Sequence, residues 1–167
     1  MIAEGAVARR PRLPARLATL ASLLPAGSVA DLGAGHGMLA AHLALAGRRV
    51  VATEAAAGPL RELRDNLARW GADVEVRAGR GLEPLLPGEV EGVVVAGLGA
   101  DVLCAIAAEA GAGGVRWVAL QCVQRPWRLA AWVERAEAVG EWHVLARAEP
   151  AERGRRYPTW VLGAGEA

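Results

Sequence analysis

Short segments with strand character alternate with segments of helical periodicity along most of this chain of 167 residues. Such alternation is typical of α/β domains, in which parallel strands form one sheet and helices cover its two faces. Near the end of the chain, two strand segments follow each other with only a polar turn between them, so we expect them to pair antiparallel. We therefore predict a doubly wound, Rossmann-like α/β fold: a seven-stranded, mostly parallel sheet with a C-terminal antiparallel β-hairpin and a short N-terminal helix.

The bounds of these elements follow from the periodicity and from glycine and proline stop signals. The run VEGVVVA at 90–96 is the most apolar strand candidate, which is typical of the centre of a parallel sheet covered on both faces. The predicted strands cover residues 28–32, 49–53, 73–77, 90–96, 115–120, 143–149 and 157–162. The predicted helices cover residues 13–24, 37–46, 59–70, 100–110 and 126–139.

The length of the chain favours one compact domain. We expect a flexible N-terminus over residues 1–11 and a single domain over residues 12–167. Charged residues interrupt every apolar run before it could cross a bilayer, and the first basic residues follow the N-terminal apolar segment, the wrong order for a secretory signal. We therefore expect a cytoplasmic protein without membrane contact.

The formal net charge of +1 argues against a generally basic coat for nucleic acid, although it leaves room for a local patch. A rim of arginines is one candidate, and a solvated arginine face is the commoner explanation for each residue alone. These arginines are Arg125, Arg128, Arg153, Arg155 and Arg156. The two scattered cysteines, Cys104 and Cys122, lie in apolar contexts, so we expect small buried hydrophobic residues and no metal site.

The segment VADLGAGHGML at 29–39 joins the first predicted strand to the next helix. Glycines at positions 33, 35 and 37 let the backbone turn tightly and approach a ligand with no Cβ in the way. Glu54 ends the next strand, where an acid can accept hydrogen bonds from the two hydroxyls of a ribose. Together these features predict a nucleoside site, with a plain strand-to-helix connection as the alternative.

Two details favour S-adenosylmethionine over a dinucleotide. A dinucleotide loop has its third glycine one position later, where this chain has Met38. The first strand also ends on Asp31, whose negative charge would repel a pyrophosphate but suits a ligand that carries an ammonium and a sulfonium. Further loops at 78–82 and 96–101 follow predicted strands, and the ligands of such sheets bind beyond the carboxyl ends of the strands.

The wider pattern of an acid before GxGxG, in a sheet that ends in a hairpin, resembles the class I methyltransferases. More narrowly, residues 13–162 resemble the TrmK family of bacterial tRNA methyltransferases, which methylate N1 of adenine 22. The most specific match is GEVEGVVVAGLGA, and the others are RLPARLATLASLLPAG, VADLGAGHGML, EAAAGPL, AGRGLEPL, VALQ with RLAAWV, and GRRYPTWV.

Four departures from the TrmK pattern concern the site and the RNA. Where the family typically has GSDHAYLP, this chain has GAGHGML, so an acid is replaced and His36 remains. A glycine-acid-glycine motif becomes Gly79-Arg80-Gly81, which removes an acceptor near the adenine of the cofactor. LQPN becomes Leu120-Gln121-Cys122-Val123, which removes a polar group beside the target pocket. The C-terminal coiled-coil extension usual in the family is absent from the sequence given.

The resemblance implies a site for each of two ligands. The cofactor S-adenosylmethionine would contact Asp31, Gly33, Ala34, Gly35, His36, Glu54, Gly79, Arg80, Gly81, Ala96 and Gly97. A target adenine would lie beside Ala96, Gly97, Leu98 and Gly99, with Gln121 bonding a base edge, Arg16 neutralising a phosphate or shaping the site, and Tyr157 offering a stacking face. No catalytic residue is assigned, because N1 of adenine carries an in-plane lone pair and needs alignment more than a strong base.

Each of three side chains also has a purely structural alternative to a role in the site. His36 could bond a neighbouring carbonyl, Gln121 could be a satisfied polar group at a strand end, and Tyr157 could pack on an edge strand. For the whole protein, the leading hypothesis is a tRNA adenine N1-methyltransferase, with tRNA as its partner. The alternatives are a methyltransferase acting on a small molecule or another RNA, and a non-catalytic cofactor-binding domain that serves a separate RNA-binding subunit.

Overall fold

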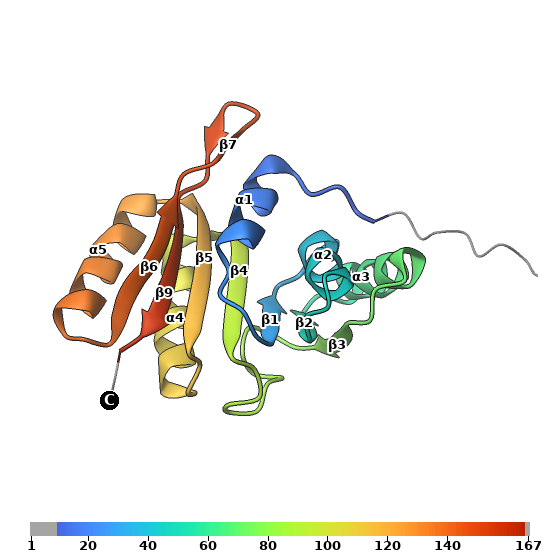
Figure 1. The fold of residues 1–167 in the computed structure, drawn as a ribbon, viewed down its shortest axis with the longest axis horizontal. Helices are drawn as coiled ribbons and strands as arrows, with labels where there is room; N and C mark the ends of the chain where they lie inside the picture. The colour runs from blue at the N-terminus through green and yellow to red at the C-terminus, as the bar shows by residue number, and fades with distance from the viewer. Residues whose placement is uncertain (1–9, 166–167) are drawn as a thin grey trace, which may run out of the picture.

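The computed structural model describes residues 10–165 and contains the predicted seven-stranded sheet (Figure 1). The first five strands are parallel to one another; a helix follows each of them except β3, which a loop joins to β4, as the sequence predicts. The strands of the sheet are β1 (Val29–Leu32), β2 (Val50–Glu54), β3 (Glu75–Ala78), β4 (Gly92–Gly99), β5 (Trp117–Gln124), β6 (Trp142–Ala148) and β9 (Thr159–Ala164). The helices are α1 (Ala15–Leu23), α2 (Met38–Leu45), α3 (Ala57–Trp70), α4 (Ala100–Ala112) and α5 (Pro126–Ala138).

The strand order of the sheet is β3-β2-β1-β4-β5-β9-β6. From β1 the chain proceeds outward through β2 to β3, and it then crosses back to β4 beside β1 and continues in the other direction. The order therefore reverses between β1 and β4. Ligands of doubly wound sheets bind at such a switch point, beyond the carboxyl ends of the strands.

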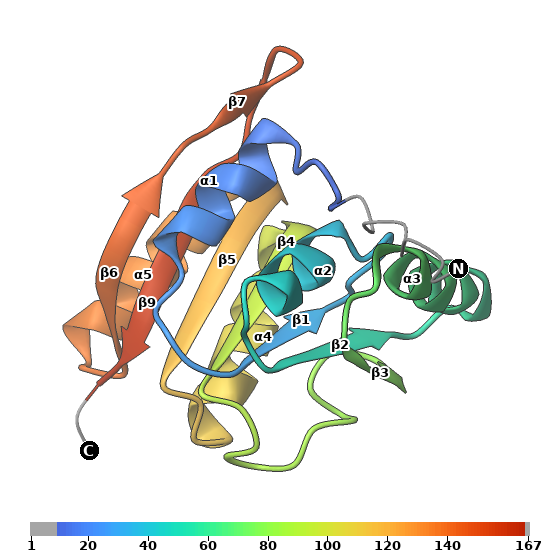
Figure 2. The ribbon, with the colours of Figure 1, turned by 45° about the vertical axis from the view of Figure 1, so that its right-hand side comes forward.

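Two hydrophobic cores lie on the two faces of the sheet. On one face the buried side chains of α4 and α5, such as Leu103 and Leu129, pack against the strands. On the other face α1, α2 and α3 supply Leu20, Leu39 and Leu63. The sheet is thus the middle of three layers (Figure 2), which explains why the strand run at 92–95 is apolar on both faces.

The predicted C-terminal hairpin is confirmed, because β6 and β9 pair antiparallel at the edge of the sheet and β9 also pairs antiparallel with β5. The connection between them is more ordered than the polar turn that the sequence predicts. Residues 151–156 form a second small antiparallel ladder of β7 (Ala151–Glu152) and β8 (Arg155–Arg156). Its turn is closed by Arg153 and Gly154, both with positive φ, and only the glycine is an evident turn signal in the sequence.

Two strands extend further than predicted. β4 runs to Gly99 and β5 to Gln124, so the AGLG segment is the irregular end of a strand and not a loop. The register between β4 and β5 shifts at Ala96/Leu98 and again at Leu98/Gly99. These bulges turn the end of β4 next to the switch point, and irregularity of this kind has no clear signal in a short apolar run.

None of the helices in the described part of the chain is long and apolar enough to span a membrane. Residues 1–9 of the predicted flexible N-terminus lie outside the described residues.

Candidate active site at the strand ends

Two cavities meet at the switch point. The larger, of about 520 Å³, lies between the ends of β1 to β3 and the helix α4, and we call it the large cavity. The smaller, of about 220 Å³, lies between α1, the glycine loop at 33–37 and the end of β4, and we call it the small cavity. Gly33 lines both cavities.

All eleven residues predicted to bind the cofactor line one or both of these cavities. Of the six candidates for substrate positioning, Arg16 and Gly97 line the small cavity and Leu98 lines the large one. Gly99, Gln121 and Tyr157 line neither. Of the predicted cofactor residues, those that line the large cavity are Gly33, Glu54, Gly79, Arg80 and Gly81. Those that line the small cavity are Asp31, Gly33, Ala34, Gly35, His36, Ala96 and Gly97.

The glycine loop needs its glycines for two reasons. Gly33, Gly35 and Gly37 have φ of +68°, +55° and +81°, a region that other residues rarely adopt. A Cβ on Gly37 would lie 2.5 Å from a methyl carbon of Leu63, so this glycine lets α3 pack closely. A Cβ on Gly33 would meet no atom within 4 Å, so that position leaves open space for a ligand.

Asp31 is a buried acid at the wall of the small cavity. Only 4% of the surface of Asp31 is exposed. Burial raises the pKa of its carboxyl from the ordinary value of 3.8 to about 7, a backbone hydrogen bond from Ala40 opposes the rise, and the negative charge of Glu54 adds to it. A cation placed beside Asp31 would stabilise the charged form and lower this pKa again.

Glu54 is fixed at the end of β2 by two backbone donors. The N–H of Gly35 donates to one carboxylate oxygen at 3.2 Å, and the N–H of Ala56 donates to the other at 3.3 Å. These bonds hold the carboxylate at the edge of the large cavity, and each oxygen keeps a lone pair for a further donor. A pair of neighbouring hydroxyls is a ligand that such a carboxylate can accept.

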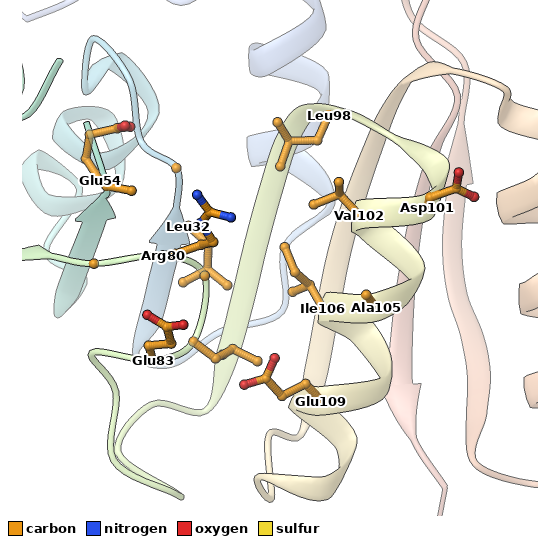
Figure 3. A pocket seen from close by; sticks show the side chains of 15 residues that line it. Leu32, Glu54, Arg80, Glu83, Leu98, Asp101, Val102, Ala105, Ile106 and Glu109 are labelled. Carbon is orange, nitrogen blue, oxygen red and sulfur yellow. The ribbon is translucent and has the colours of Figure 1, made fainter.

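The wall opposite Glu54 comes from α4 (Figure 3). Val102 and Ile106, one helical turn apart, point from α4 toward the cavity, and Leu98 extends this apolar surface. The sequence hypothesis missed this wall, although the (i, i+4) spacing of Val102 and Ile106 after the strand end is a signal that could have found it.

The loop after β3 forms another part of the wall of the large cavity, next to Glu54. The N–H of Gly79 donates to the carbonyl of Glu54 at 3.1 Å, and the hydroxyl of Thr53 donates to the carbonyl of Gly81 at 3.3 Å. A Cβ on Gly79 would lie 2.3 Å from Pro84, which explains the glycine. Arg80 is exposed and lines the large cavity, where its planar guanidinium can lie against a flat ring.

Gln121 is completely buried and does not reach either cavity. Its amide oxygen accepts from Nη1 of Arg16 at 3.0 Å, and its amide nitrogen donates to the carbonyl of Arg16 at 2.9 Å and to the hydroxyl of Thr159 at 3.0 Å. These bonds occupy the polar atoms that a base edge would need. The structure therefore favours the alternative in which Gln121 is a satisfied polar group at a strand end.

Arg16 and Tyr157 lie together beside that amide. The guanidinium of Arg16 is 5.2 Å from the centre of the Tyr157 ring, and its Nε is 3.7 Å from Oε2 of Glu152 on β7. Arg16 thus lines the small cavity and also contacts the β7–β8 hairpin.

His36 hydrogen-bonds a carboxylate, whereas its structural alternative in the sequence analysis was a bond to a neighbouring carbonyl. Its Nδ1 lies 2.8 Å from Oε1 of Glu62 on α3, and its side chain is largely exposed. Within residues 10–165, no three His, Cys, Asp or Glu side chains are grouped so that they could hold a metal ion.

A cavity beside a glycine loop, with acids near the ends of β1 and β2 at the switch point of the sheet, is the arrangement of a Rossmann-like α/β fold with a ligand site at its strand ends. A family model described as a methyltransferase domain matches residues 13–157, and the chain therefore belongs to this methyltransferase family. The chain is 32% identical over 100 residues to the tRNA (adenine(22)-N(1))-methyltransferase of Bacillus subtilis (strain 168). The match covers 57% of this chain and 42% of that protein, so the chain spans less than half of its relative.

Solved structures share the fold. An uncharacterised protein of Listeria monocytogenes superposes with a TM-score of 0.82 at 26% identity, over 93% of this chain and 70% of that one. The M1A22 tRNA methyltransferase TrmK of B. subtilis gives 0.81 at 23% identity, over 93% and 68%. Sp1610 of Streptococcus pneumoniae in complex with S-adenosyl-L-methionine gives 0.81 at 23% identity, over 93% and 75%. These likenesses show that the chain has the same fold as these structures.

Proposed function

We propose that this chain is an S-adenosylmethionine-dependent methyltransferase that methylates N1 of an adenine in tRNA. The observation that carries the proposal is the meeting of the two cavities at Gly33, with Glu54 at the edge of one and Asp31 in the wall of the other. The sequence relative that methylates adenine 22 of tRNA supports the choice of substrate. We place the activity in the cytoplasm and in a single domain over residues 12–167.

The residues of the large cavity fit the nucleoside half of the cofactor. Glu54 would accept the ribose hydroxyls, and the surface formed by Leu98, Val102 and Ile106 would contact the adenine. The aminoacyl half would pass Gly33, where no side chain blocks the path, and its ammonium would reach Asp31. A buried carboxyl in the wall of this cavity suits a cationic ligand better than a pyrophosphate.

The chain's own residues would mainly align the two reactants. When bound, the cofactor supplies a methyl group on a sulfonium: the N1 lone pair forms the new N–C bond as the C–S bond breaks, and the bond pair stays on sulfur. Ala96 and Gly97 would border the target base, and Gly97, with φ of +81° and no atom within 4 Å of a Cβ, leaves room for it. Holding the reacting atoms in line can contribute several kcal/mol toward lowering the barrier, on the order of 7–11 in favourable cases.

We expect Glu54→Gln to weaken binding of S-adenosylmethionine and of adenosine alike, by about tenfold. The amide would present a donor to either the Gly35 or the Ala56 N–H, which both need an acceptor, and it would accept fewer bonds from the ribose. Isothermal titration calorimetry with both ligands measures the effect. Glu134→Gln on the exposed face of α5 is the matched control, and unchanged affinities for Glu54→Gln would contradict the ribose role.

The test of the activity is to incubate the purified chain with unmodified bulk tRNA and a labelled methyl donor, followed by nucleoside analysis. We expect label in 1-methyladenosine. Tight binding of S-adenosylmethionine without formation of 1-methyladenosine would contradict the tRNA substrate. Failure to bind S-adenosylmethionine would contradict the whole proposal.

A further inference from the structure

Six arginines from α1, the start of α5 and the β7–β8 hairpin gather near the carboxyl end of β5, and we call them the arginine rim. Three acids pair with members of the rim, so the group carries an excess of three positive charges in a chain whose formal net charge is +1. The remainder of the chain is therefore net acidic. The rim consists of Arg16, Arg125, Arg128, Arg153, Arg155 and Arg156, and the acids are Asp101, Glu149 and Glu152.

Contacts within the rim join its parts into one surface. Arg155 on β8 donates to the carbonyl of Val123 near the end of β5 at 3.2 Å, and its guanidinium lies 6.0 Å from the ring of Tyr157. Arg16 on α1 lies over the same ring at 5.2 Å. The hairpin extends beyond the sheet beside α1 (Figure 2), and α1 and β7 are in contact.

The charges of the rim remain available to a partner. The side chains of Arg125, Arg128 and Arg156 are 59%, 54% and 71% exposed, and exposed ion pairs of this kind contribute little to stability. Arg153 occupies the exposed turn of the hairpin. Trp127, 68% exposed at the start of α5, adds a flat face on which a base can stack.

We propose that the arginine rim binds the phosphate backbone of the tRNA, and that the β7–β8 hairpin guides the strand so that its target base enters the small cavity. This inference rests on the proposed function. Arg16 connects the hairpin part of the rim with the small cavity, because it contacts Glu152 and Tyr157 and also lines that cavity. Arginine suits the role because its planar fork can bind a phosphate through two hydrogen bonds.

The test compares the full chain with the double variant Arg153→Glu/Arg156→Glu. We expect its affinity for unmodified bulk tRNA to fall at least about tenfold. Each lost phosphate contact lowers the magnitude of the slope of log affinity against log salt by about 0.7–0.9, so two contacts lower it by roughly 1.4–1.8. The KM for tRNA should rise, while the affinity for S-adenosylmethionine stays unchanged.

Arg64→Glu/Arg135→Glu is the matched control with the same change in net charge. Arg64 lies on the exposed face of α3, and Arg135 lies in the last turn of α5, away from the rim. We expect this control to bind tRNA much as the unaltered chain does, and equal losses in both double variants would overturn the proposal by showing an effect of net charge alone.

The outcomes separate this inference from the proposed function. If the unaltered chain methylates tRNA and the rim variant binds it equally well, the rim proposal is wrong and the proposed function stands. If the unaltered chain binds tRNA through the rim but forms no 1-methyladenosine, the rim stands and the methylation proposal is wrong. A chain that binds no tRNA would contradict both.

Discussion

Asp31→Asn is expected to lower the affinity for S-adenosylmethionine by about 100-fold, which corresponds to about 2.7 kcal/mol. The loss follows from the removal of a buried charge that would face the ammonium of the ligand, and removing one member of such a pair typically costs about 2–5 kcal/mol. Adenosine, which lacks the aminoacyl group, should bind the variant as it binds the unaltered chain. This difference separates Asp31 from Glu54, whose replacement should weaken both ligands.

The same substitution is expected to stabilise the unliganded protein at high pH. A carboxyl whose pKa rises from 3.8 to about 7 on folding gives stability that is present at pH 4 and is lost as the pH rises through 7. The loss is on the order of 4 kcal/mol. Asn carries no such penalty, so the gap in the free energy of unfolding between the variant and the unaltered chain should widen from pH 5 to pH 8.

Denaturant unfolding at pH 5 and pH 8, and calorimetric titration with both ligands, measure these effects. Binding of the cationic ligand should also release a proton from Asp31. The affinity should therefore rise by up to about tenfold for each unit by which the pH is raised toward 7. Asp65→Asn, an exposed acid on α3, is the matched control. An Asp31→Asn variant with unchanged affinity for S-adenosylmethionine would contradict the assigned role.

Gln121→Met is expected to destabilise the protein by about 2–4 kcal/mol, although it changes the side-chain volume little. Three hydrogen bonds are lost, and the buried hydroxyl of Thr159 and the carbonyl and guanidinium of Arg16 each lose a partner. The loss should also loosen Arg16 at the small cavity. We expect methyl transfer to slow by about tenfold or more while binding of S-adenosylmethionine stays within about twofold.

Thermal unfolding and single-turnover methylation check this pair of effects. Gln124→Met, on the exposed end of the same strand, should leave both unchanged. A Gln121→Met variant that is destabilised but transfers the methyl group at the full rate would show that Gln121 holds the fold without positioning Arg16.

The sequence predicted which residues would come together at the candidate site where their geometry is local. Asp31, the glycine loop and Glu54 each stand at the end of a strand, and the alternation of strands and helices alone brings these ends together. The role of Gln121 depends on Arg16, which is 105 positions away, and no short pattern reports such a contact. The apolar wall that α4 contributes could have been predicted from the sequence, because Val102 and Ile106 follow helical spacing.

The ordered hairpin was missed for another reason. The segment at 150–156 carries the composition of a turn, and its two short strands pair mainly with each other, so no apolar alternation marks them. Tertiary contact with α1 accompanies the ladder, and this contact likewise leaves no periodic signal.

Gly33 belongs to the walls of both cavities, so a single peptide segment would contact the methyl donor and also line the small cavity that receives the acceptor base. Any shift of this segment on binding of one reactant would change the affinity for the second. Linkage requires the effect to be mutual: the factor by which tRNA alters the affinity for the donor must equal the factor by which the donor alters the affinity for tRNA. One residue without a side chain would thus couple the two binding equilibria.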